Sequence, residues 1–461
     1  MNRNLLAGEG KALNQDVGNR RKGTDEKSIW VSSLSNFSVQ YNFSVIAIAL
    51  KIMAKEYKQN EWIKELLKGV VFAGAITGQL LMGYVGDLMG RNKAMFITIL
   101  FAGAGALGSS IFSWGDRFSV YGIIAASRFV LGVGVGGVYP LSATKAAEES
   151  ATTDRQARNL RVSQAFFWQT PGSISPYVVS LILLCAFSSR ELQFRILLAV
   201  GAIPSLFIMY ASLGEAESAE FNRKDGASTW ELLQERKWWW KLIGTGGSWL
   251  IYDVVYYGTS LFSPTIVAKI FGEGNDLFKE SWQNIIVTSA GLPAIVAGIY
   301  CQQQFGSKTL QVWGFLFIAA CFFLLGGCYN SFGPKSTFGL YILLLFSLNF
   351  GPNITTFILP AEVYPPKVRS TMNGISAAMG KLGAIIGTYI YQPIYDRFGI
   401  STLMFVAGSI SLSGMIISYF AIDSDLDEGF ESATTSNIIY DGVDQHDDEN
   451  KNLGNGESVQ Q

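Results

Sequence analysis

The sequence contains few charged residues and almost no histidine. Only 15% of its 461 residues are Asp, Glu, Lys or Arg, against 49% hydrophobic residues, and the mean hydropathy is +0.26. This composition is too apolar for an ordinary soluble protein. The 35 basic and 36 acidic residues nearly cancel, so no excess of positive charge indicates nucleic acid as a partner.

The scarcity of histidine and cysteine limits the available chemistry. The single histidine, His446, lies in an acidic, polar C-terminal stretch. Triads that use histidine, His-ligated zinc and histidine proton relays therefore lack their central residue. The four cysteines lie in apolar runs without CxxC spacing and are interpreted as small buried hydrophobic residues. We expect no disulfide framework, no metal site, no cofactor and no catalytic residues, so an enzyme is not predicted.

Long apolar stretches dominate the sequence instead. A helix needs about 20 apolar residues to cross roughly 30 Å of hydrocarbon. Nine charge-free stretches of about this length occur, and three more are each interrupted by one charge, namely Arg128, Asp253 or Lys381. We therefore predict an all-α membrane protein with twelve transmembrane helices. The predicted spans cover residues 31–50, 69–86, 94–115, 118–144, 162–189, 196–214, 242–268, 281–307, 309–334, 336–361, 370–395 and 398–422.

The longest hydrophilic connector divides these spans into two groups of six. Both ends of the chain are polar, so we expect them to be disordered, and the N-terminal end has no apolar core typical of a cleavable signal peptide. The distribution of Lys and Arg between alternate connectors favours a cytoplasmic location for both termini. The predicted parts are an N-tail (1–29), a first six-helix half (30–214), a cytoplasmic central loop (215–241), a second six-helix half (242–422) and an acidic C-tail (423–461).

A glycine-rich motif, GYVGDLMGRNK, follows the second predicted span and begins at Gly83. Gly83 and Gly90 allow helices to approach closely, and Asp87 and Arg91 can form a pair four residues apart. The spacing G-x-x-x-D-x-x-G-R-x-K matches the signature loop of the major facilitator superfamily. We expect these four residues to act in gating and not in substrate binding. The alternative interpretation is an ordinary turn flanked by charged residues, without a role in gating. A weaker echo of the loop occurs 216 residues later, at Gly306.

Three ionisable residues lie inside predicted spans, where a charge is costly and is usually functional or paired. We expect Arg128 to neutralise either a backbone group or a carboxylate. Asp253 and Lys381 can meet across a central cavity, and a simple salt bridge is the alternative role. Trp249, Asp253 and Tyr257 follow one another at intervals of four residues, so they line one face of a helix.

Further polar side chains lie in other predicted spans, Gln169 in the fifth and Asn349 and Asn353 in the tenth. Together with Lys381, Trp249 and tyrosine hydroxyls, they provide donors suited to a small oxyanion. An ionised Asp253 would repel such an anion unless one of the two carries a proton. Proton-coupled anion transport through Asp253 follows as a hypothesis.

Four segments resemble the eukaryotic phosphate:proton symporter family of the major facilitator superfamily. They are GYVGDLMGRNK, GVGVGGVYPLSA, WLIYDVVYY and the long block from Asn349 to Gly387, and the likeness spans nearly the whole chain. The resemblance implies alternating-access transport of inorganic phosphate with protons across a lipid bilayer, with the plasma membrane as the default location. Transferred by motif position, it implies a phosphate site made of Tyr139, Gln169, Trp249, Asp253, Tyr257, Asn353 and Lys381.

Two departures from that family leave alternatives open. Val138 stands where the family usually has an aspartate, and Val39-Gln40-Tyr41-Asn42 replaces its D-x-Y-D pattern. The alternatives are coupling through Asp253 alone, uniport or exchange, another coupling cation, and an organic phosphate as substrate. A sugar carrier of the same superfamily and a phosphate sensor without transport are the competing functions. The segment AIDSDLDEGF lacks the PETKG-like ending expected of sugar porters.

Overall fold

The computed structural model of the chain is helical throughout the part that it describes, with no strand among those residues. The predicted N-tail and C-tail and most of the central loop lie outside this part. The all-α prediction is confirmed. The described residues are 29–58, 60–148, 155–212, 231, 234–260 and 276–422.

The helices before the central loop begin with one over residues 29–53. The others are α2 (Glu61–Met89), α3 (Arg91–Ile111), α4 (Arg117–Glu148), α5 (Arg155–Phe167), α6 (Gln169–Ala186), α7 (Arg190–Val200) and α8 (Ile203–Ser212).

The helices after the central loop begin with a continuous run that contains a π-helical turn, η1. Its parts are α11 (Arg236–Leu242), η1 (Ile243–Gly247) and α12 (Ser248–Ser260). The remaining elements are α14 (Leu277–Ser289), α15 (Gly291–Phe305), α16 (Ser307–Cys328), α17 (Pro334–Phe350), α18 (Pro352–Val363), the 3₁₀ turn η2 (Pro366–Val368) and α19 (Arg369–Ala421).

Nine helical segments among the described residues are long and apolar enough to cross a membrane. One of them contains the whole of α19, which includes the last two predicted spans and has a non-helical residue at Gly399. The nine do not include the helix over 29–53 or the run 236–260, although the described residues of both predicted spans are helical. The total of twelve spans and the division at the central loop stay predictions.

Two glycines end helices in the same unusual conformation. Gly90, between α2 and α3, has φ 104° and ψ 154°, and Gly306, between α15 and α16, has φ 79° and ψ 162°. A positive φ favours glycine because it has no Cβ. The weak sequence echo between the two loops therefore corresponds to a repeated backbone turn, as expected for related halves.

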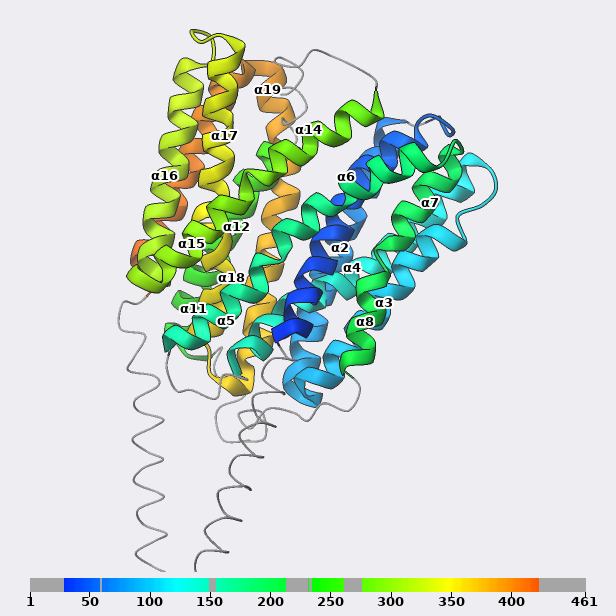
Figure 1. Cartoon of the computed structure of the whole chain (residues 1–461). Helices are drawn as coiled ribbons and strands as arrows, with labels where there is room; N and C mark the ends of the chain where they lie inside the picture. The colour runs from blue at the N-terminus through cyan, green and yellow to red at the C-terminus, as the bar shows by residue number, and fades with distance from the viewer. Residues whose placement is uncertain are drawn as a thin grey trace, which may run out of the picture. The chain divides into compact units, whose positions relative to one another are not determined.

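Helices from the two parts of the chain lie against each other (Figure 1). In Figure 1, α2, α3, α4, α7 and α8 group on one side and α11, α12, α15, α16 and α17 on the other, while α5 lies beside α15 and α18, and α14 reaches across to α6. The most extensive packing between the two parts is that of α2 along α19 and of α6 along α14, and α4 and α5 also contact helices of the second part. We call the end of the bundle that contains the α2–α3 turn the Gly90 end, and the opposite end, where α14 begins, the Glu280 end.

Candidate functional site

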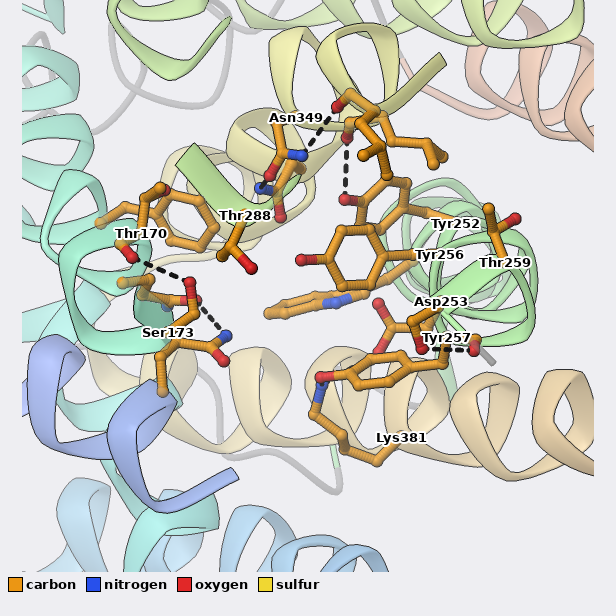
Figure 2. A pocket seen from close by; sticks show the side chains of 18 of the residues that line it. Thr170, Ser173, Tyr252, Asp253, Tyr256, Tyr257, Thr259, Thr288, Asn349 and Lys381 are labelled. Atoms are coloured by element: carbon orange, nitrogen blue, oxygen red, sulfur yellow. Dashed lines mark hydrogen bonds and ion pairs between the residues drawn. The ribbon is translucent and has the colours of Figure 1, made fainter. Parts of the chain in front are cut away.

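A cavity of about 130 Å³ lies between the two groups of helices. All seven residues predicted to bind substrate line it: Tyr139, Gln169, Trp249, Asp253, Tyr257, Asn353 and Lys381. Figure 2 shows Asp253, Tyr257 and Lys381 together on one side of the cavity and Ser173 on the opposite side. The structure thus brings the predicted residues together, and their role in binding stays a prediction.

The charged centre of the cavity is an ion pair between Lys381 and Asp253. The Lys381 Nζ atom lies 3.0 Å from Asp253 Oδ2, and both side chains are only 3% exposed. Nζ also donates to the Tyr257 hydroxyl at 3.2 Å. It lies 4.8 Å from the centroid of the Tyr257 ring and 5.2 Å from that of Tyr139, close enough for cation–π attraction. The ammonium group is therefore held in the cavity with a partner that an entering anion must share or displace.

The ion pair depends on the close packing of α12 against α19. A Cβ atom at Gly383 would overlap the main-chain carbonyl of Leu250, and one at Gly387 would overlap that of Val254. A Cβ atom at Gly380 would overlap the indole ring of Trp249. The three glycines, spaced by three and four residues, face α12 and bring the two backbones into contact. This contact holds Lys381 within reach of the carboxylate on α12.

The wall of the cavity from the first half is a set of uncharged polar groups. Gln40 Nε2 donates to Gln169 Oε1 at 2.8 Å and lies 3.4 Å from the Tyr139 hydroxyl. Gln169 Nε2 donates to Asn36 Oδ1 at 2.7 Å. The sequence analysis did not identify Gln40 and Asn36 as site residues. Their spacing of four residues in an apolar span could have indicated a polar face on that helix.

The wall from α17 and α18 is formed around a break between these two helices. α17 ends at Phe350 and α18 begins at Pro352, because proline cannot continue the hydrogen-bond pattern. Asn353 Nδ2 donates to Asn349 Oδ1 at 3.1 Å, and Asn349 Nδ2 donates to the Leu345 carbonyl. Both asparagines line the cavity. Further lining residues that sequence reasoning missed are Thr170, Ser173, Tyr252, Tyr256 and Thr288.

This chain has uncharged side chains at the positions where the phosphate:proton symporter family usually has acidic residues. Val138 is buried within the apolar core. The Asn42 amide donates to the carbonyls of Ser38 and Gly201. Arg128 is buried, and its Nη2 donates to the main-chain carbonyl of Asn42 at 2.7 Å. Of the two partners expected for Arg128, a backbone group or a carboxylate, the structure shows a backbone group. Within the described part of the chain, its Nε and Nη1 have no hydrogen-bond partner.

The Gly90 end contains a network of charges that connects the two halves. The expected pair forms, with Arg91 Nη2 3.1 Å from Asp87 Oδ1. The Asp87 carboxylate also accepts hydrogen bonds from the Thr371 main-chain N–H at 2.7 Å and the Thr371 hydroxyl at 2.6 Å. Glu148 Oε1 lies 2.9 Å from Arg91 and 3.4 Å from Arg369 Nη1. Sequence reasoning missed the three residues beyond the motif, because two belong to the start of α19 and one to the end of α4.

The close approach at this end also involves the first glycine of the motif. A Cβ atom at Gly83 would lie 2.7 Å from the Ser370 main-chain carbonyl oxygen. This distance leaves no room for a side chain, so α2 and α19 touch along their backbones beside the charge network. The network and the backbone contact therefore join the two halves side by side at the Gly90 end.

The Glu280 end also has polar contacts between the halves. Lys51 Nζ lies 3.0 Å from Glu280 Oε2, and the two side chains are 40% and 24% exposed. The hydroxyls of Ser180 and Ser281 lie 3.3 Å apart. Among the described residues, the contacts at this end include a partly hydrated ion pair, a hydroxyl contact and the apolar packing of Leu277 against the first half.

Long apolar helices around a buried, charged cavity define a helical membrane transporter. The Major Facilitator Superfamily model matches residues 32–388 of the chain. The inorganic phosphate transporter PT2 of Toxoplasma gondii is 41% identical over 407 residues, which cover 87% of this chain and 72% of that protein. The probable inorganic phosphate transporter 1-6 of Arabidopsis thaliana is 26% identical over 489 residues, covering 88% and 94% of the two chains.

Solved structures share the fold. The proton:xylose symporter XylE bound to 6-bromo-6-deoxy-D-glucose matches with a TM-score of 0.74 at 17% identity, over 87% of this chain and 97% of that chain. The inward-open xylose transporter XylE from E. coli matches with a TM-score of 0.59 at 20% identity, over 86% and 95%. The chain belongs to the phosphate transporter family of the Major Facilitator Superfamily. It is an integral, multi-pass membrane transporter and not an enzyme.

Proposed function

We propose that this transporter carries inorganic phosphate by alternating access and that its transport is coupled to protons through Asp253. The observation that carries the proposal is the buried ion pair of Lys381 and Asp253 in a cavity whose lining also includes several hydrogen-bond donors. The names of the Toxoplasma and Arabidopsis relatives support phosphate as the substrate.

Phosphate recognition is assigned to both walls of the cavity. Lys381 supplies the positive charge, and charge-assisted hydrogen bonds to phosphate are the strong ones. Neutral donors surround the remaining oxygens. They are the hydroxyls of Tyr139 and Tyr257, the indole N–H of Trp249 and the amides of Gln169 and Asn353.

Proton coupling follows from competition for one ammonium group. In the empty site, Lys381 is paired with the Asp253 carboxylate. A proton on that carboxyl removes its negative charge, releases the ammonium group and ends the repulsion of phosphate. Proton binding and phosphate binding therefore favour each other, and the coupling acts equally in both directions.

Gating is assigned to the two ends of the bundle. The latch at the Gly90 end consists of Gly83, Asp87, Gly90 and Arg91. We place this end and both termini on the cytoplasmic side of the plasma membrane. Lys51 and Glu280 close the opposite end. Rocking of the two halves about the cavity would break one set of contacts while the other forms.

Radiolabelled phosphate uptake into proteoliposomes tests the proposal, with and without an inward proton gradient and with Lys381→Ala as the blank. We expect accumulation that requires the gradient. In Asp253→Asn, phosphate exchange should persist while gradient-driven accumulation is lost. Equal accumulation by wild type and Asp253→Asn would refute coupling through this residue. Saturable binding without uptake would identify a sensor, and uptake of glycerol phosphate in preference to phosphate would identify an organic phosphate carrier.

A further inference from the structure

Four side chains of the first half form one continuous line of hydrogen bonds that ends at the cavity. Asn36 Nδ2 donates to the main-chain carbonyl of Ser32 at 2.9 Å, and Gln169 Nε2 donates to Asn36 Oδ1 at 2.7 Å. Gln40 Nε2 donates to Gln169 Oε1 at 2.8 Å and to the Tyr139 hydroxyl at 3.4 Å. We call this set the amide chain.

The direction of the amide chain is set by its first member. A main-chain carbonyl such as that of Ser32 can only accept, so Asn36 must turn its NH₂ group toward it. The Asn36 oxygen then faces Gln169, which must present its own NH₂ group, and the Gln169 oxygen must in turn receive the NH₂ group of Gln40. Each amide orientation therefore follows from the one before it.

The Tyr139 hydroxyl is the last member and is left with a free hydrogen. Its oxygen accepts from Gln40, and the described residues offer its own O–H no acceptor. The side chain lines the cavity, and the Tyr139 ring lies 5.2 Å from the Lys381 ammonium group. A hydroxyl whose oxygen already accepts is ready to donate, and a bound anion would supply the missing acceptor.

We propose that Gln40 is a positioning residue for the anion site: anchored through Gln169 and Asn36, it keeps the Tyr139 hydroxyl oriented as a donor. The inference rests on the proposed transport of phosphate and adds a specificity device to it. A ligand is favoured if it presents an acceptor oxygen to this hydroxyl and disfavoured if it presents a donor. Because the amides do not titrate, this wall keeps the same polarity at every pH at which Asp253 gains or loses a proton.

The alternative is that Gln40 only holds helices together. Gln40 lies half-buried on the wall of the cavity and not within the apolar core. A purely structural role predicts lower stability and a lower amount of folded transporter, with an unchanged KM for phosphate. A positioning role predicts a raised KM with a smaller change in the maximum rate. Kinetics of phosphate uptake therefore separate the two roles.

The decisive variant is Gln40→Glu, which keeps the shape of the side chain and changes a donor into an acceptor. An ionised carboxylate at this position repels Gln169 Oε1 and takes the Tyr139 hydrogen for itself. We expect the KM for phosphate to rise at least tenfold relative to wild type at neutral pH. The ratio to wild type should fall again in acid, as the new carboxyl takes up a proton. The ratio is used because Asp253 and phosphate itself can also take up protons over this range; Lys381 and Tyr139, which face the same cavity, are common to both proteins.

A double-mutant cycle tests the connection to Tyr139. Gln40→Leu and Tyr139→Phe should each raise KM several-fold, and the double variant should be no worse than Tyr139→Phe alone, because the donor that Gln40 positions is already gone. The control is Gln234→Glu, the same change at an exposed glutamine just before α11, where KM should not change. All variants are compared by size-exclusion profile and thermal stability.

Two results would overturn the assignment of Gln40. One is a KM in the double variant that rises by the product of the two single effects, and the other is an unchanged KM in Gln40→Glu. Failure of the proposed function has a different result. In that case the wild-type protein itself would show no saturable phosphate uptake, so it would have no KM with which the variants could be compared.

Discussion

The charge network at the Gly90 end gives the sharpest prediction about the conformational cycle. Glu148 is fully buried and pairs with Arg91 of its own half and with Arg369 of the other half. The substitution Glu148→Gln preserves the size of the side chain and removes its charge. Two buried guanidinium groups would then share an amide in place of a carboxylate, an arrangement that only the closed state contains.

The expected size of the effect follows from the burial of all three side chains. Removing one partner of a buried ion pair costs about 3–5 kcal/mol, because a charge is left without compensation. In the open state the arginines are hydrated, so most of this cost falls on the closed state. At about 1.4 kcal/mol per factor of ten, the ratio of closed to open molecules should fall by roughly two to three powers of ten.

Thiol accessibility in proteoliposomes measures this ratio. The four native cysteines are replaced, one cysteine is introduced at Ser370, and its reaction with a membrane-impermeant maleimide is followed from the Gly90 side. Ser370 is buried in the closed interface, so labelling reports opening. Glu148→Gln should label much faster than the parent. The matched control is Glu235→Gln, which breaks the exposed pair with Lys237 and should leave the rate unchanged. Equal labelling rates in Glu148→Gln and its parent would refute the role of this network as a latch.

Three further predictions concern single contacts. Gln79→Leu should slow the same labelling reaction. Both polar atoms of the buried Gln79 amide lack a hydrogen-bond partner among the described residues, so removing them should stabilise the closed state by about 1–3 kcal/mol. Faster labelling would contradict this. Lys51→Gln should weaken closure of the Glu280 end by at most about 1 kcal/mol, since the pair with Glu280 is partly hydrated and screened by salt; its effect on uptake should vanish in high salt. Gly383→Val should lower the melting temperature and abolish uptake, because its Cβ would overlap the Leu250 carbonyl and separate α12 from α19; normal uptake would show that this packing is not needed.

Much of the fold could be predicted because a membrane imposes long apolar helices. Where the structure describes them, the predicted spans are mostly helical, although those at 94–115 and 162–189 run a few residues past the ends of α3 and α6, and the α2–α3 turn at Gly90 lies at the predicted motif. The breaks were not predicted. α5 gives way to α6 at Trp168, three residues before Pro171, inside a stretch that was taken as one span. Such interruptions are tolerated where neighbouring helices satisfy the freed backbone groups, and hydropathy alone does not reveal those neighbours.

The candidate site could likewise be predicted from the sequence only in part. Trp249, Asp253 and Tyr257 could be placed together from helical spacing, since their geometry is local. The pairing of Asp253 with Lys381, 128 residues away, was one of two roles left open by the sequence. The partnership of Gln40 with Gln169 depends on the packing of two distant helices, and no local pattern encodes which face of one meets which face of the other.

The charges inside the predicted spans lead to a last prediction, on the response of transport to membrane potential. Those spans contain two cations, Arg128 and Lys381, and one acid, Asp253, so the interior without substrate has a net charge of +1 when the acid is ionised. In the coupled state, with a proton on Asp253, a divalent phosphate makes the interior neutral. Because charge in a low-dielectric interior is costly, the loaded carrier should change state more readily than the empty one.

The return of the empty carrier should then move one positive charge through part of the membrane field, worth up to about 2.3 kcal/mol per 100 mV for a full crossing. Phosphate exchange uses only the loaded carrier, so its rate should not respond to a potential set with potassium and valinomycin. Net uptake includes the return step and should respond. An identical response of exchange and net uptake would mean that the interior charge is compensated by groups other than substrate. In Arg128→Met the empty interior is neutral, and the difference between the two responses should disappear.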